Sequence, residues 1–326
     1  MNVQKIILSD ISKKLQNTFD LFICSSSFEE RSLSVANHID ITSVKKALIV
    51  ANINLQEYVG ANTNNLANKF KGKVKIVETS TEDPIITADN ISKNIADAKD
   101  AKTILLDITA FTHESLLILL RLLQLHCPSA KITGVYASAS AYSADDDVKH
   151  KWLSRGIGEV RSVLGFPGNI VPSRKTHLIM IVGYEHERAA GIIDSIEPNS
   201  IALGYGRSGS ATTEKDKDAN EHYMHLVEQM ATSFSAVNCF ELPCNDPYKV
   251  RDIIQYQVNK AGDLNILIAP MNNKLSTIGA AWVALNDESI QMCYANALRY
   301  NYSNYSRPGT DCYVFELELP QKVQEL

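Results

Sequence analysis

The chain has 326 residues, of which 45% are hydrophobic and 21% are charged, and its net charge at pH 7 is −5. This length fits two domains better than one, and the composition is that of ordinary globular cores. The negative balance argues against broad binding to nucleic acid, because such binding requires a positive surface. It leaves room for a pocket that holds one nucleotide.

Apolar runs and cysteines bear on the location of the protein. No apolar run reaches the roughly 18 residues of a membrane-spanning helix, and the amino terminus lacks the basic-then-apolar pattern of a signal peptide. The six cysteines show neither a C-x-x-C pair nor a His/Cys spacing typical of zinc ligands. We therefore expect a cytoplasmic protein with reduced thiols, without a metal, a cofactor or a membrane partner.

The predicted elements alternate strand and helix along the chain. Short apolar runs that indicate strands lie at 21–24, 47–50, 74–79, 104–107 and 135–143, and again at 179–182, 201–203, 237–242, 266–269 and 293–301. Helical segments lie between them, and each series ends with one more strand after a Ser-Arg turn, at 159–166 and at 312–317. Because the apolar runs are continuous rather than alternating, we predict parallel strands that are buried on both faces.

The two series share residues as well as rhythm. Three matched pairs keep the same order: Glu-Arg at 30–31 and 187–188, Asp-Pro at 83–84 and 246–247, and Tyr-Ala-x-Ala-x-x-Tyr at 136–142 and 294–300. Two unrelated domains of this class would share the alternation of strands and helices at similar spacing but not these residues, so we predict an internal duplication. Pro and Gly in the stretch 166–172 favour a linker there, and the predicted halves are 1–170 and 171–326.

Alternating strands and helices favour right-handed crossovers and open sheets. We therefore predict an α/β protein with two tandem, internally duplicated Rossmann-like sheets, doubly wound and mostly parallel, related by pseudo-two-fold symmetry. The last strand of each half fits an antiparallel edge. Ligands of such folds bind beyond the carboxyl ends of the strands, so the loops that follow the strands are the candidate sites.

The first loop of each half combines small residues with the Glu-Arg pair. Ser26 and Ser27 precede Arg31, and Gly183 precedes Arg188. Free N–H groups at the start of a helix attract an anion, whereas an arginine there opposes the helix dipole unless it meets a carboxylate or a phosphate. Both arginines are therefore candidate ligand contacts. The alternative is that each Glu and Arg pair with one another, cap the helix or face solvent.

The loops after the fourth strands form the second group of candidates. They contain groups that hold phosphates, sugars or base edges: Thr109, Thr112 and His113 in the first half, and Asn272, Asn273 and Lys274 in the second. Thr112 also fits a helix N-cap, and a capped helix start still offers N–H groups to a ligand. The alternative for His113 is an ordinary exposed polar residue.

Two further segments leave alternatives open. The glycine-rich loop 204–213 contains Arg207 and matches G-x-G-x-x-G in spacing, so it is either a phosphate cradle or a surface loop. Tyr300, Tyr302 and Tyr305 either stack a base or pack against other side chains. The sequence contains neither a G-x-S-x-G elbow nor an H-E-x-x-H motif, which gives no lead to a hydrolase of those classes.

Two Rossmann-like halves with polar loops after the first and fourth strands resemble the CRISPR-associated Rossmann-fold (CARF) sensor domains and their fused SAVED relatives. That family carries an Asp-x-Thr-x-Gly-x-Lys-like loop before a helix. The first half keeps Asp107 and Thr109 but lacks the Gly and has His113 at the Lys position, and the second half keeps only Lys274. The resemblance implies a cleft between the halves that binds a nucleotide second messenger, which some relatives also cleave.

From this resemblance we expect a cytoplasmic prokaryotic nucleotide sensor of the anti-phage type, which acts through a separate effector protein or by assembly. The expected ligand contacts are Ser26, Ser27, Arg31, Thr109, Thr112, Arg188, Arg207, Asn272, Asn273 and Lys274. A rival expectation is an enzyme that cleaves a nucleotide or nucleoside, either a ring-nuclease-like phosphodiesterase or an N-glycosidase, with His113, Glu30 and Glu187 as candidate acid/base groups. A third is a scaffold subunit of a defence complex with a vestigial pocket.

Overall fold

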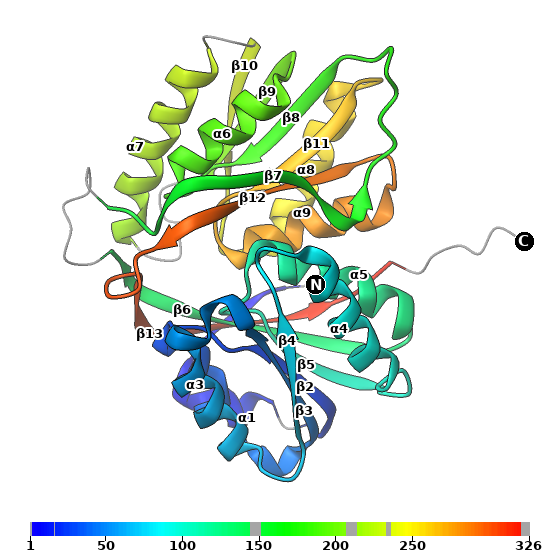
Figure 1. Cartoon of the computed structure of the whole chain (residues 1–326), viewed down its shortest axis with the longest axis vertical. Helices are drawn as coiled ribbons and strands as arrows, with labels where there is room; N and C mark the ends of the chain where they lie inside the picture. Colours follow the sequence, from blue (N-terminus) through cyan, green and yellow to red (C-terminus); the bar gives the residue numbers. More distant parts are fainter. Residues whose placement is uncertain (1, 16, 144–150, 207–213, 233–235, 321–326) are drawn as a thin grey trace, which may run out of the picture. The chain divides into compact units, whose positions relative to one another are not determined.

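The structure, a computed structural model, describes residues 2–15, 17–143, 151–206, 214–232 and 236–320. Its strands form two sheets, each with helices packed against it (Figure 1). No helix within the described ranges is long and apolar enough to cross a membrane.

The first sheet has seven strands in the order β1-β13-β6-β5-β2-β3-β4. Its strands are β1 (Gln4–Ile7), β2 (Phe19–Ser25), β3 (Val44–Asn52), β4 (Val74–Thr79), β5 (Thr103–Asp107), β6 (Lys131–Tyr142) and β13 (Ser306–Leu317). From β6 to β4 every neighbouring pair is parallel, whereas β1 is antiparallel to β13.

The second sheet has six strands in the order β10-β9-β8-β11-β12-β7. Its strands are β7 (Ser154–Pro167), β8 (Thr176–Ile181), β9 (Ser200–Gly206), β10 (Ala236–Leu242), β11 (Asn265–Pro270) and β12 (Gln291–Tyr300). From β10 to β12 the pairs are parallel, and the edge strand β7 is antiparallel to β12.

The two sheets have the same strand order. The series β4-β3-β2-β5-β6 in the first sheet corresponds to β10-β9-β8-β11-β12 in the second, and one further long strand adjoins β6 or β12. The predicted fold class, two Rossmann-like and mostly parallel α/β sheets, is therefore confirmed. The chain reverses its direction of winding between β2 and β5 and between β8 and β11, which is where ligands bind in such sheets.

Several of the helices begin at a residue whose side chain caps the first turn. The helices are α1 (Ile11–Lys14), α2 (Ser34–His38), α3 (Gln56–Lys69), α4 (Pro84–Ala96), α5 (His113–His126), α6 (His186–Ile196), α7 (Glu214–Ala231), α8 (Pro247–Ala261) and α9 (Lys274–Asn286). The repeated Asp-Pro pairs start α4 and α8: Asp83 and Asp246 each accept hydrogen bonds from two backbone N–H groups, and the proline that follows needs no partner. This shared cap explains one of the three matched pairs.

The chain divides into two compact units that differ from the predicted halves. Unit 1 comprises residues 1–140 and 307–326, and unit 2 comprises residues 141–306. The predicted halves 1–170 and 171–326 are corrected because the two last strands are exchanged: β7 pairs with β12, and β13 lies between β1 and β6. Apolar patterning specifies that each segment is a strand, but it does not specify which sheet completes its hydrogen bonds.

Each unit has its own hydrophobic core. In unit 1, Phe22 and Phe70 are fully buried with their ring centroids 5.2 Å apart. In unit 2, Leu178 and Met180 of β8 are fully buried against α6 and α7. The apolar strands are therefore held rigidly from both sides, so the loops at their carboxyl ends begin from fixed positions.

Candidate functional site

The Arg31 side chain of the repeated Glu-Arg pair is a brace inside unit 1. It is only 3% exposed and lies in the short 3-10 turn Glu30–Leu33. Its Nε and Nη2 donate to the Glu29 carboxylate at 3.1 and 2.7 Å, and its Nη1 donates to the carbonyl oxygen of Ala137 at 3.1 Å. The guanidinium also lies 5.9 Å from the centroid of the Tyr136 ring.

Arg188 makes the corresponding brace in unit 2. It is 3% exposed, it donates from Nη1 to the Glu185 carboxylate, and it donates from Nε to the carbonyl oxygen of Ala295 at 2.8 Å. Its guanidinium lies 5.1 Å from the centroid of the Tyr294 ring. The matched Glu-Arg and Tyr-Ala pairs of the sequence are therefore two sides of one buried contact, present once in each unit.

This contact identifies the acidic partners of the two arginines. Arg31 pairs with Glu29 rather than with Glu30, which is exposed, and Arg188 pairs with Glu185 rather than with Glu187. The sequence left two interpretations of these arginines open, ligand contact or internal ion pair, and in the structure both arginines form an internal ion pair. Their guanidinium groups hold the first loop of each unit against β6 or β12, and this is the role that the structure supports for them.

Asp107 ends β5 at the point where the winding of the first sheet reverses, and it is 1% exposed. The backbone N–H and the hydroxyl of Thr109 both donate to its Oδ1, whereas Oδ2 is buried with no hydrogen-bond partner among the described residues. Burial raises the pKa of Asp107 to about 7. Thr109 also accepts a hydrogen bond of 2.9 Å from the backbone N–H of Ala137, so this predicted ligand contact has internal partners.

The remaining predicted residues of unit 1 lie at the same edge of the sheet and are packed into the protein. Ser26 accepts a hydrogen bond from the Thr63 hydroxyl at 2.8 Å, and the Ser27 hydroxyl accepts from the backbone of Glu29 at 3.3 Å. Thr112 is the N-cap of α5, and His113 at the first position of that helix is only 7% exposed. The capping interpretation of Thr112 is confirmed, whereas the exposed position considered for His113 is wrong.

In unit 2 the predicted residues after β11 tie two loops together. Asn272 donates to the carbonyl oxygen of Val182, and Asn273 caps α9 while it donates to the carbonyl oxygen of Cys244 at 2.8 Å. Gly183 lies so close to this loop that a Cβ atom there would be 2.3 Å from the carbonyl oxygen of Met271. Lys274 is half-buried at the start of α9. Arg207 lies outside the described residues.

A cavity of about 200 Å³ opens beside the first loop of unit 2, at the carboxyl end of β8. Three segments that are far apart in the sequence line it: the start of β7 with Lys151 and Trp152 before it, the end of the loop between β8 and α6 with the first residues of α6, and Tyr223 of α7. The lining residues are Lys151, Trp152, Ser154, Arg155, Tyr184, Glu185, His186, Glu187 and Tyr223. Of the sequence-predicted site residues, Glu187 belongs to this cavity.

Aromatic rings form the wall of the cavity. His186 stacks on Tyr223 with a centroid distance of 5.1 Å and an interplanar angle of 13°, and Tyr184 lies 5.8 Å from Tyr223. The guanidinium of Arg155 lies 4.5 Å from the centroid of the Trp152 ring. Stacked rings and a cation beside them are the groups that hold a flat, partly charged ligand.

The polar groups of the cavity differ in whether they already have hydrogen-bond partners within the protein. Glu185 accepts from both Ser154 and Arg188, and Glu187 accepts from the backbone N–H of Gly156 at 3.0 Å. The Nδ1 atom of His186, in contrast, is buried without a partner among the described residues. Burial lowers the pKa of His186, with a partial offset from the Glu187 carboxylate, so the ring is neutral at neutral pH. His186 is therefore a lining residue of the cavity whose Nδ1 atom is buried without a partner among the described residues.

Most of these lining residues were missed by reasoning from the sequence. The stretch 183–188 drew attention as a repeat, but Tyr184 and His186 within it have no equivalent in the first half. Trp152 and Tyr223 come from other elements, and no short motif connects them to this loop. The three tyrosines considered for base stacking are partly exposed and contact one another: Tyr300 lies 6.2 Å from Tyr302 and 6.4 Å from Tyr305.

Among the described residues, no three His, Cys, Asp or Glu side chains converge in an arrangement suited to a metal ion. No protein-family model and no curated protein matches the sequence.

The similar solved structures are remote. The cytoplasmic domain of a prokaryotic cation chloride cotransporter is 8% identical with a TM-score of 0.24, over 88% of this chain and 99% of that chain. A ketoreductase from the macrolactin assembly line is 11% identical with a TM-score of 0.24, over 87% of this chain and 57% of the other. A ketoreductase from the first module of phoslactomycin biosynthesis in Streptomyces sp. HK803 is 9% identical with a TM-score of 0.21, over 87% and 66%. None of these likenesses bears on function.

Proposed function

We propose that the protein is a nucleotide-sensing protein and that the cavity of unit 2 at the carboxyl end of β8 receives the base of its ligand. The observation that carries this proposal is the unpartnered Nδ1 of His186 in a cavity walled by the rings of Trp152, Tyr184 and Tyr223. Stacking on aromatic rings contributes about 1–3 kcal/mol per base and tolerates any base, because every base has a π face.

The polar groups divide the tasks of recognition. A neutral imidazole nitrogen accepts a hydrogen bond from a base N–H or a sugar hydroxyl, or donates one in its other tautomer. Arg155 offers a planar cation to a phosphate. Lys151 contributes less, because its Nζ already donates to the carbonyl oxygens of Tyr142 and Ser143 at 2.6 and 3.1 Å. The ligand that fits best is therefore a base and sugar with few phosphates near them.

The wider biological role follows from the resemblance to the CARF and SAVED domains. In this role the protein is a cytoplasmic prokaryotic sensor of the anti-phage type, and nucleotide binding alters its contact with a separate effector protein or its own assembly. Two Rossmann-like sheets of the same strand order support the resemblance at the level of fold. The proposed ligand site lies within unit 2, so it does not depend on a shared cleft.

A second candidate function is cleavage of the bound nucleotide or nucleoside. The observation that favours it is the neutral His186 next to Glu187 in the same cavity. An imidazole with a lowered pKa and a free ring nitrogen can take a proton from an attacking water or from a ribose hydroxyl. In this interpretation His186 replaces His113 and Glu30 as the candidate base, because those two residues belong to unit 1 and are not among the residues that line this cavity.

The test is a thermal-shift screen of the whole protein with mononucleotides, dinucleotides and cyclic oligonucleotides, followed by chromatography of each hit after incubation. A ligand that binds only the native state raises the melting temperature by mass action. We expect a hit whose affinity is weakened up to about tenfold by His186→Ala, since a hydrogen bond to a neutral partner contributes up to about 1.5 kcal/mol. An intact ligand supports the sensor, and a consumed ligand supports the enzyme.

A matched control keeps the screen specific. Arg251 of α8 lies 5.8 Å from the ring centroid of the other tryptophan, Trp282, a contact of the same kind as that of Arg155 with Trp152 at 4.5 Å. Arg155→Gln should weaken a phosphate-bearing ligand, whereas Arg251→Gln should leave its affinity unchanged. A protein that gives no shift with any nucleotide but that co-purifies with one tight protein partner would instead be the scaffold subunit.

A further inference from the structure

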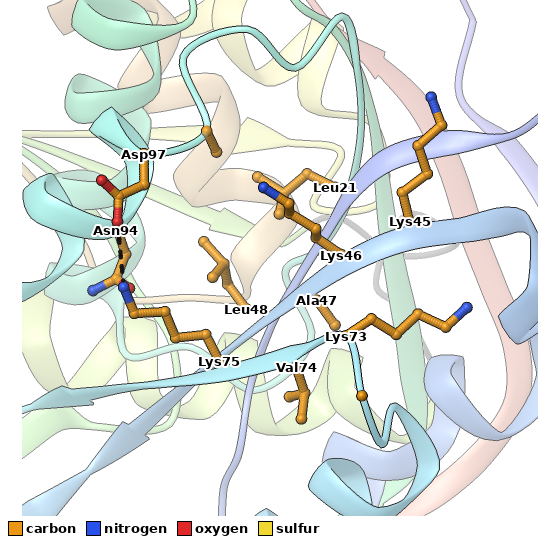
Figure 2. Close-up of a pocket in the computed structure, with 12 residues that line it drawn as sticks. Leu21, Lys45, Lys46, Ala47, Leu48, Lys73, Val74, Lys75, Asn94 and Asp97 are labelled. Carbon is orange, nitrogen blue, oxygen red and sulfur yellow. Dashed lines mark hydrogen bonds and ion pairs between the residues drawn. The ribbon is translucent and has the colours of Figure 1, made fainter.

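A second hollow, of about 420 Å³, lies in unit 1 at the opposite edge of the first sheet, near the amino ends of β3 and β4 (Figure 2). Its floor is the sheet and its side wall is the end of α4. The residues around it are Leu21, Lys45, Lys46, Ala47, Leu48, Gly72, Lys73, Val74, Lys75, Asn94, Asp97 and Ala98. None of these residues has a part in the function proposed above.

The strand register decides which lysines face α4. Leu21 pairs with Lys46, and Leu48 pairs with Lys75, so these four side chains share one face of the sheet. Figure 2 shows Lys46 and Lys75 on the side of Asn94 and Asp97, whereas Lys45 extends away from them. Two ammonium groups and two leucine side chains therefore line the part of the hollow that α4 covers.

The lysines differ in their partners. Lys45 pairs with Asp20 at 2.7 Å, Lys73 donates to the carbonyl oxygens of Ile41 and Val44 at 2.8 Å each, and Lys75 pairs with Asp97 at 3.3 Å. Lys46 has no ion pair or hydrogen bond to any residue that the structure describes. One positive charge in the hollow is therefore left for a ligand.

Asn94 contributes an acceptor to the same hollow. Its Nδ2 donates to the carbonyl oxygen of Asn90 at 2.7 Å, which fixes the orientation of the amide because the reversed amide would set two oxygens against each other. Its Oδ1 is buried and has no hydrogen-bond partner among the described residues. A buried acceptor without a partner is costly, so a ligand that donates to Oδ1 gains more than it would at the surface.

Comparison with the corresponding hollow in unit 2 shows which features come with the repeated fold and which residues are particular to unit 1. A hollow of about 190 Å³ lies there, lined by His177, Ser200, Ala202, Asn238, Gln257, Lys260, Ala261 and Leu264. The strand register puts Ser200 in the position of Lys46, since His177 pairs with Ser200 as Leu21 pairs with Lys46. Counted from the matched Asp-Pro caps, Gln257 stands where Asn94 does. The hollow thus comes with the repeated fold, whereas the lysines of the sheet occur in unit 1.

We infer that the lysine hollow, defined as Leu21, Lys46, Leu48, Lys75, Asn94 and Asp97, binds a small organic anion. Its carboxylate or phosphate lies on Lys46 with Lys75 nearby, an N–H or O–H group donates to Asn94 Oδ1, and an apolar body packs on Leu21 and Leu48. A simple inorganic anion does not meet these requirements, because an exposed ion pair alone contributes little. The site is independent of the nucleotide site proposed for unit 2.

The test is ligand-observed NMR on the whole protein with three probes: 4-hydroxybenzoate, 4-hydroxyphenyl phosphate and the neutral 4-hydroxybenzamide. We expect at least one anion to bind at millimolar concentration and the amide not to bind. Lys46→Gln should weaken the anion by about tenfold, as expected for a hydrogen bond to a charged group. Lys45→Gln, which removes the neighbouring charge from outside the covered part of the hollow, should leave it unchanged. The two anions distinguish a carboxylate site from a phosphate site.

A second comparison tests the acceptor. Asn94→Ala should weaken 4-hydroxybenzoate but not benzoate, which lacks the donor. Lys46→Arg, which keeps the charge, should retain binding and excludes a loss caused by misfolding. The inference is overturned if neither anion binds, if the amide binds as well as the benzoate, or if Lys46→Gln and Lys45→Gln behave alike. Equal effects of Asn94→Ala on both acids would overturn the assignment of Asn94.

Discussion

The Nε atom of Arg188 and the carbonyl oxygen of Ala295 lie 2.8 Å apart, and Nη1 of Arg31 lies 3.1 Å from the corresponding oxygen of Ala137. The same buried cation thus fastens the first loop to the same strand in both units. These contacts account for two of the matched pairs in the sequence. They also explain how each loop keeps its position at the ligand-binding edge of its sheet.

Replacement of Arg31 by Ala should destabilise the protein by about 3 kcal/mol or more, because it leaves the Glu29 carboxylate and the Ala137 carbonyl oxygen buried without their partner. The measurement is urea unfolding followed by circular dichroism. Lys131→Ala is the control, because Lys131 pairs with Glu316 at 3.3 Å but both side chains are more than half exposed. The control should lose less than about 1 kcal/mol of unfolding free energy. Equal losses for the two variants would show that Arg31 is not a brace.

Replacement of Asp107 by Asn should remove a pH dependence of stability. Burial raises the pKa of Asp107 from 3.8 to about 7, so the folded protein keeps a proton that the unfolded chain releases. Wild-type stability should therefore fall as the pH rises between these two values and level off above the upper one, by on the order of a few kcal/mol. Urea unfolding over this pH range should give a shallower slope for Asp107→Asn. Parallel curves would contradict the raised pKa.

The same substitution, Gly→Ala, should have opposite effects at two positions. At Gly183 the new Cβ would lie 2.3 Å from the carbonyl oxygen of Met271, so the two loops at the carboxyl edge of sheet 2 must separate, with an expected loss of about 2 kcal/mol. At Gly60, inside α3, the nearest atom is the flexible end of Gln56 at 3.2 Å, and alanine should stabilise the helix by about 0.5–1 kcal/mol. The measurement is the melting temperature of each variant relative to the wild type. A Gly183→Ala variant that is more stable than the wild type would refute the close contact.

The sequence predicted the features that depend on local chemistry. Continuous apolar runs indicated buried parallel strands, and Thr112 was interpreted as a helix N-cap. The Asp-Pro pairs at 83–84 and 246–247 were found as matched pairs ahead of helical segments, and the structure adds their capping role. Each of these depends on residues within one or two turns, so composition and spacing contain the necessary information.

The features that the sequence did not predict depend on contacts across long separations. The partner of Arg31 includes the backbone of Ala137, more than a hundred residues away, and side-chain identity does not reveal a backbone acceptor. The exchange of β7 and β13 needs the three-dimensional pairing of strands whose apolar patterns are alike. The cavity needs Trp152, Tyr184 and Tyr223 from three elements, and each of them has packing as its ordinary explanation.

The most direct test of the proposed function uses Trp152 as the reporter. The chain has two tryptophans, and Trp282 stacks on Tyr248 in the helical layer of unit 2, so Trp282→Phe leaves Trp152 as the single fluorophore. Titration of this variant with the nucleotide panel should give a saturable change in emission for at least one nucleotide. Adding His186→Ala should weaken the affinity for that nucleotide up to about tenfold. A nucleotide that raises the melting temperature without any change in Trp152 emission, or a panel that causes neither effect, would contradict a nucleotide site in this cavity.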